Sequence, residues 1–141
     1  DREILKILSH PQVEEILEGP VLTADFLIRT KPWMAWISSP DLKNPKRLKE
    51  QVLETVEKFE KKYVAYYRRG IQRTGRSYPM FNPRPRILAI PGLGVFCTGQ
   101  TPQEAAVTAD LARATLKVKS DIVAMGGRYR GIDEDKMFEM E

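Results

Sequence analysis

The sequence is poor in the residues that build metal sites and nucleophilic sites. Its 141 residues include one histidine, His10, and one cysteine, Cys97, so no internal disulfide can form. A zinc site normally needs several histidine, cysteine or carboxylate ligands at compatible positions. The Gly-x-Ser-x-Gly pattern of a nucleophile elbow is also absent. From the residues alone we therefore expect no catalytic residue and no metal ligand in this chain.

Long apolar runs are lacking as well. No stretch approaches the roughly 18 apolar residues of a membrane-spanning helix, and no signal peptide is visible. A single cysteine fits a reducing compartment, and its place in an apolar strand predicts a buried, inert thiol. We therefore expect a cytoplasmic protein with no membrane partner. The sequence begins at Asp1 and ends at Glu141 without a terminal signal, which we interpret as a piece of a longer protein.

Positive charge is concentrated in the middle of the chain. Residues 43–100 carry 13 basic and 4 acidic side chains, whereas both flanking segments have a small acidic excess. Four arginines separated by glycine and other residues form the candidate anion-binding loop: Arg68, Arg69, Arg73 and Arg76. Arginine binds planar anions bidentately, so this loop could hold a phosphate, a carboxylate or a nucleic-acid backbone. The alternative is that these arginines pair with acidic flanks of the same domain or of the parent protein.

Hydrophobic periodicity predicts an α/β fold. Helices are expected at Arg2–Ser9, Pro11–Leu17, Ala24–Ile28, Asn44 to about Gly70, and Thr101 to about Met125. The inner stripe of the last helix is expected to be Ala105, Thr108, Leu111, Thr115, Val118 and Ile122. Strands are expected at Trp33–Ile37, Ile87–Ile90 and Val95–Thr98. We therefore predict a small mixed sheet packed by two long helices, with one domain over residues 1–127 and a polar tail, or the start of a next segment, over residues 128–141.

The central stretch has the most specific local pattern. The strand Ile87–Ile90 leads into a glycine turn, a second strand follows, and Thr101 begins a capped helix through Pro102 and Glu104. A dinucleotide fingerprint is a competing interpretation of these glycines. It fails because Cys97 occupies the position of the third glycine and because the helix begins only at Thr101.

Three blocks of the sequence share a pattern with one family. They are His10–Val13 with Leu22–Lys31, the central Pro83–Ala106 stretch, and Asp135–Glu141. Together they resemble the middle region of proteins that fuse a class II aldolase to a short-chain dehydrogenase, of the rhamnulose-1-phosphate aldolase/alcohol dehydrogenase type. The resemblance spans nearly the whole chain and implies a fold like the C-terminal half of a class II aldolase domain.

This chain departs from the active aldolase pattern at its hairpin turn. Where active class II aldolases have a His-Gly turn, this chain has Leu93-Gly94, and the His-x-His zinc motif is missing. Neither the aldolase glutamate nor the dehydrogenase Tyr-x-x-x-Lys motif has a match. The resemblance therefore implies a degenerate aldolase-like segment without a cofactor of its own. Zinc and NAD(P) would belong to the neighbouring aldolase and dehydrogenase domains of the parent, which are the implied partners.

Three functions remain open from the sequence. The first is a non-catalytic scaffold or interaction domain of a sugar-metabolising aldolase/dehydrogenase, with a homo-oligomer as an open alternative. The second is a sugar-phosphate or other anion-binding module that uses the loop from Arg68 to Arg76. The third, nucleic-acid binding, is disfavoured because the total charge is modest and no recognised motif is present.

Overall fold

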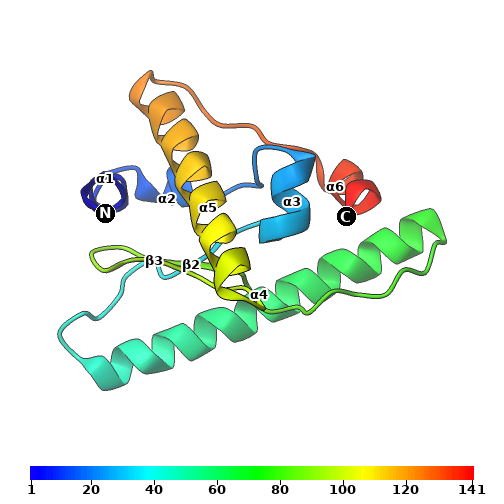
Figure 1. The fold of residues 1–141 in the computed structure, drawn as a ribbon, viewed down its shortest axis with the longest axis horizontal. Coiled ribbons are helices and arrows are strands. Elements are labelled where there is room, and N and C mark those ends of the chain that lie inside the picture. Colours follow the sequence, from blue (N-terminus) through cyan, green and yellow to red (C-terminus); the bar gives the residue numbers. More distant parts are fainter.

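The computed structural model describes residues 1–141 as nine secondary-structure elements around a small sheet (Figure 1). In chain order the elements are α1 (Arg2–Leu8), α2 (Val13–Leu17), α3 (Ala24–Thr30), β1 (Ala35–Trp36), α4 (Pro45–Thr74), β2 (Ile87–Ile90), β3 (Gly94–Cys97), α5 (Pro102–Ala124) and α6 (Glu134–Met140). The predicted mixed sheet with two long helices is confirmed. No helix combines the length and the apolar character that crossing a bilayer requires.

The sheet has the order β1-β2-β3, with β1 parallel to β2 and β2 antiparallel to β3. Ala35 pairs with Leu88, and Ile90 pairs with Gly94 at the hairpin end. β1 has two residues rather than the predicted five, because only Ala35 and Trp36 lie in register with β2. A parallel strand needs a crossover before its partner, and the long helix α4 lies in that crossover.

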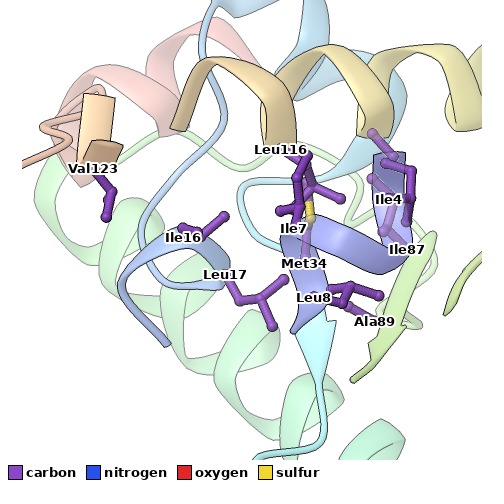
Figure 2. Packing of buried hydrophobic residues seen from close by; sticks show 11 residues of the cluster. Ile4, Ile7, Leu8, Ile16, Leu17, Met34, Ile87, Ala89, Leu116 and Val123 are labelled. Carbon is purple, nitrogen blue, oxygen red and sulfur yellow. The ribbon is translucent and has the colours of Figure 1, made fainter. Parts of the chain in front are cut away.

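Each face of the sheet packs against its own hydrophobic cluster. Alternate side chains of a strand point to opposite faces. Ile87 and Ala89 therefore join the cluster made with α1, α2 and α5, which Figure 2 shows from close by. Ala35 and the half-buried Leu88 face the second cluster, made with α3, α4 and α6. The molecule is thus a three-layer arrangement with helices on both faces of a very small sheet.

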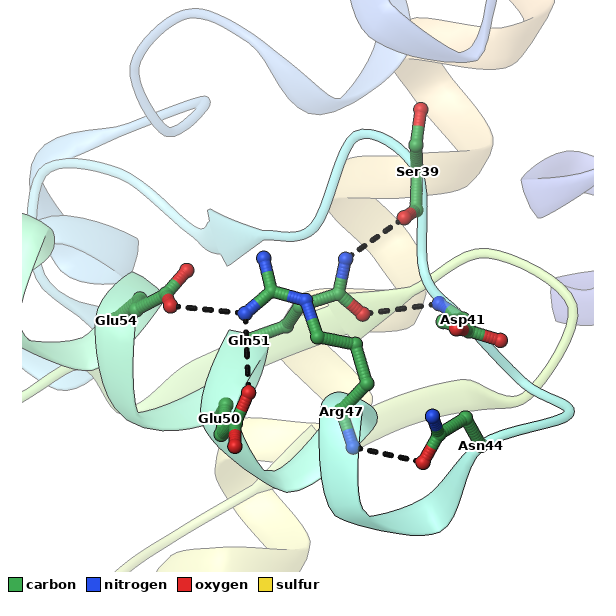
Figure 3. A network of polar contacts seen from close by, with 7 residues as sticks. All are labelled: Ser39, Asp41, Asn44, Arg47, Glu50, Gln51 and Glu54. Carbon is green, nitrogen blue, oxygen red and sulfur yellow. Dashed lines mark hydrogen bonds and ion pairs between the residues drawn. The ribbon is translucent and has the colours of Figure 1, made fainter.

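Polar contacts hold the start of the long helix α4 against the loop that connects it to β1 (Figure 3). Asn44 caps the helix by accepting from the Arg47 amide. The Gln51 side chain donates to the Ser39 carbonyl and accepts from the Asp41 amide, both at 2.9 Å. These two bonds hold the preceding loop on the first turns of α4, although this half of the helix is only partly buried.

Two predicted features of the long helices are wrong in detail. α4 continues to Thr74, one turn beyond Gly70, and ends at Gly75 in the left-handed conformation (φ 65°). In α5 the buried stripe is rotated relative to the prediction, so that Val118 is 41% exposed while Lys119 is 1% exposed. The reason is that the Lys119 ammonium donates to the carbonyls of Glu18 and Gly19. A buried lysine with carbonyl partners can thus occupy a core position.

Residues 128–141 are not simply a polar tail. They contain α6, whose Met137 and Phe138 are buried in the second cluster. Arg69 of α4 also binds Glu134 through two hydrogen bonds of 2.7 and 3.0 Å. The charged neighbours of the Met-Phe pair masked this helix in the sequence. Packing therefore continues beyond residue 127, the boundary that the sequence suggested for the domain.

Candidate functional site

The hairpin and its capped helix have the predicted order, although β3 (Gly94–Cys97) begins and ends one residue earlier than the predicted Val95–Thr98. Thr101 caps α5 by accepting from the Glu104 amide at 3.2 Å, and the Glu104 carboxylate accepts from the Gln100 amide at 2.8 Å. Gly99 is needed where the chain enters the helix, because a Cβ there would lie 2.5 Å from the backbone nitrogen of Ala105. Since α5 begins at Pro102, its N-terminus is separated from the glycine turn by the whole of β3. This geometry does not suit a dinucleotide pyrophosphate.

The residues of this chain do not fit a zinc ion. No group of three or more histidine, cysteine, aspartate or glutamate side chains gathers anywhere in the structure. Leu93 occupies the hairpin turn and is 48% exposed. His10 lies between α1 and α2, where its Nδ1 accepts from the Gln12 amide. Cys97 is half-buried, and burial raises the pKa of its thiol, so the protonated form prevails at neutral pH.

An apolar groove lies along β3, one of the two edge strands of the sheet. Its volume is about 310 Å³, and its walls come from α1, β3 and α5. Leu5, Leu93 and Phe96 contribute to it and remain between 41% and 50% exposed. An unpaired strand edge beside exposed apolar side chains is a surface suited to another protein segment. The sequence predicted the hairpin that forms one wall of this groove. The contribution of α1 to the groove is visible only in the tertiary structure.

The four candidate anion-binding arginines lie on the last turns of α4 and just after it, not in one loop. Arg69 is paired with Glu134 and Arg73 with Asp135, both from α6. For these two side chains the structure has the arrangement that the sequence left open as pairing with an acidic flank. Arg68 and Arg76 form no ion pair in the structure. Arg73 and Arg76 line one surface cavity together with Tyr78 and Asp135.

Lys31 is an unusual position that the sequence did not predict. Its backbone has φ 75° and ψ 165°, a conformation that is nearly confined to glycine and costs on the order of 1–3 kcal/mol. Pro32 follows it and favours the extended ψ. The side chain is 5% exposed, and its ammonium has no hydrogen-bond partner. Burial lowers the pKa of Lys31 to about 8, against weaker opposition from Glu141.

An aromatic pocket of about 440 Å³ lies next to Lys31. Its walls include Tyr63 and Phe138, with Phe81 from the segment that follows α4. The Lys31 ammonium lies 3.9 Å from the centre of the Tyr63 ring and 5.4 Å from that of Phe81. Tyr63 donates through its hydroxyl to the Glu141 carboxylate. This pocket therefore lies between α4, α6 and the segment 78–81, and Lys31 lies behind its Tyr63 wall.

The buried lysines and tyrosines predict an unusual dependence of stability on pH. Burial lowers the pKa of Lys31 and Lys119 to about 8 from an ordinary 10.5. Between these values the unfolded chain binds more protons, so the free energy of unfolding rises with pH, by up to about 1.4 kcal/mol per pH unit for each lysine. Burial raises the pKa of Tyr63 and Tyr66 above their ordinary 10, so the trend reverses above about pH 10.

Urea unfolding between about pH 7 and pH 11 measures this dependence. The expected result is a maximum of stability near pH 10. A free energy of unfolding that falls steadily from pH 8 would contradict it. In a Lys119→Met variant the rise should be shallower by the share of one lysine.

Comparisons with known proteins agree with the hairpin and helix geometry. A family model described as "Aldolase class II, second domain" matches residues 1–141. An "Uncharacterized oxidoreductase YuxG" of Bacillus subtilis (strain 168) is 25% identical over 140 residues, which is 99% of this chain. The chain spans only 20% of the length of that relative. No solved structure matches significantly.

Proposed function

Because the chain belongs to the family of class II aldolase second domains, we propose that it is a non-catalytic scaffold or interaction domain of a longer enzyme. That enzyme would combine aldol cleavage of a sugar phosphate, with zinc, and NAD(P)-dependent oxidoreduction in other domains. The observation that carries the proposal is Leu93. It lies at the hairpin turn, where the active class II aldolases that this chain resembles have histidine. The oxidoreductase name of the much longer relative supports the second activity of the parent.

The interaction role is supported by the groove along β3. A domain that serves assembly needs a surface on which its neighbours can pack, and exposed apolar side chains beside a free strand edge suit that purpose. Leu93 itself lies in this groove. The position that holds histidine in active class II aldolases would thus contribute to an interface here.

Two measurements test the proposal. First, this chain is incubated with zinc and L-rhamnulose 1-phosphate, and the formation of aldehyde product is followed; turnover above the buffer rate would overturn the non-catalytic role. Second, Phe96→Glu is introduced in the full parent chain, with Val118→Glu on the outer side of α5 as the matched control. We expect Phe96→Glu alone to separate the domains in limited proteolysis. Equal protease resistance in both variants would count against an interface at β3.

A sugar-phosphate or other anion-binding module is the alternative function. Arg76 favours it, because this arginine has no carboxylate partner and lines the same cavity as Arg73. Phosphate esters should then raise the melting temperature, and Arg76→Ala should abolish the rise. Arg47→Ala, at the far end of α4, is the control. A melting temperature that is unchanged across a panel of sugar phosphates would contradict this alternative.

A further inference from the structure

The first half of α4 has no hydrophobic core of its own. Figure 1 shows this helix along one edge of the molecule. No residue from Ser38 to Lys58 is buried, and Phe59 is the first residue of α4 that is. Most of the stability of helices in proteins comes from packing of an apolar face against another element. The first turns of α4 are therefore the part of this helix whose face has no partner within the chain.

Leu53 lies in the exposed face of this half of α4. Its side chain is 61% exposed. It lines a hollow of about 580 Å³, together with Val56 and Glu60 of the same helix. The other wall of the hollow comes from the segment before β2, with Arg84 and Pro85. An exposed leucine in a hollow with polar edges is typical of a surface that binds another protein.

The charged residues of this face are arranged symmetrically about Leu53. Lys49 and Glu57 lie four residues before and after it, and Lys46 and Glu60 lie seven residues before and after it. At about 100° per residue, all five positions fall within an arc of about 80° on the helix surface. In an antiparallel pair of such helices that cross at Leu53, each Lys49 meets the partner's Glu57. Each Lys46 likewise meets the partner's Glu60.

These charged groups remain available for pairing with a second molecule. Lys46 and Lys49 form no ion pair within the chain. Glu57 pairs with a lysine one turn later, and Glu60 pairs with Arg84, each through its Oε1 atom only. The Oε2 atoms of both carboxylates take no part in these pairs. An unrelated partner would have no reason to repeat the same spacing with the opposite signs, so the charges favour a second copy of this chain.

We propose that two copies of this chain associate through an antiparallel pair of α4 helices, with the two Leu53 side chains in contact on the two-fold axis. The same face then serves both copies, as a two-fold interface requires. This face shares no residue with the groove along β3, so the inference does not rest on the proposed scaffold role. A contact over about four helical turns is small, so the association should be weak and should decrease with salt.

Sedimentation equilibrium of the 141-residue chain, at low and high salt and at up to about 1 mM protein, tests this pairing. We expect a monomer–dimer equilibrium in which Leu53→Glu raises the dissociation constant about tenfold or more. Ile28→Glu is the matched control, because Ile28 is similarly exposed, at 58%, but lies on α3. Lys49→Glu should also weaken the dimer. The double variant Lys49→Glu/Glu57→Lys should restore it, because the same pairs form with exchanged signs.

Disulfide cross-linking checks the position of the two-fold axis. In a Cys97→Ser background, Leu53→Cys should give a covalent dimer on mild oxidation, since this residue faces its own copy, whereas Ile28→Cys should not. Circular dichroism confirms that the variants are folded. A chain that stays monomeric at 1 mM, or a dimer that Leu53→Glu leaves unchanged, would overturn the proposal. Loss of the dimer in Phe96→Glu alone would place the contact at β3 instead, and no recovery in the double variant would exclude this antiparallel register.

Discussion

Replacing Gly70 with alanine is expected to release α6 from α4. Gly70 is buried in the helix, and a Cβ there would lie 2.2 Å from the ring of Phe138. Alanine favours a helix over glycine by about 1 kcal/mol, so an ordinary helical site would gain stability. Here the Phe138 ring must leave its site, which loses about 1.5–3 kcal/mol of burial and exposes the aromatic pocket. We therefore expect a net destabilisation of about 0.5–2 kcal/mol.

Hydrogen exchange and thermal unfolding together measure this effect. The amides of residues 134–140 should lose protection in Gly70→Ala, while those of α5 keep theirs. In the Phe138→Ala background the same glycine substitution should be neutral or stabilising, because the clash is gone. A rise in melting temperature for Gly70→Ala alone would show that α6 does not depend on this close approach.

The elements with strong local signals were predictable from the sequence. Asn44 and Thr101 cap their helices with the expected bonds, and β2 has the predicted bounds. These features depend on residues a few positions apart, so the sequence determines them directly. Thr23 likewise caps α3, accepting from the Phe26 amide at 3.4 Å.

The candidate pocket could not be predicted in the same way. Lys31 looks like a surface lysine before a proline, and only its positive φ and its contact with Tyr63 bring it inside. The Tyr63–Glu141 bond joins residues 78 positions apart. The sequence did not predict α6, because a single Met-Phe pair among charged residues shows no helical periodicity. Contacts between distant segments determine all three features, and no local pattern encodes them.

The second large effect on stability is expected in α5, at the adjacent residues Val118 and Lys119. The sequence pattern places Val118 inside and Lys119 outside, whereas the structure has the reverse. Lys119→Ala removes a buried four-carbon stem and the donor to the carbonyls of Glu18 and Gly19. We expect the free energy of unfolding to fall by about 2–4 kcal/mol. The cavity and the lost hydrogen bonds cost more than is gained when an ammonium no longer has to be buried. Val118→Ala should stay within about 0.5 kcal/mol.

Urea unfolding of the two variants decides between the sequence pattern and the structure. Lys119→Met separates the two causes of the loss, because methionine keeps most of the stem but cannot donate. Its cost should therefore be smaller than that of alanine and should reflect the unpaired carbonyls alone. The turn at Gly19 also packs against Tyr129, whose ring lies 4.7 Å from the Lys119 ammonium. A larger loss for Val118→Ala than for Lys119→Ala would mean that α5 packs with the face that the sequence pattern suggests.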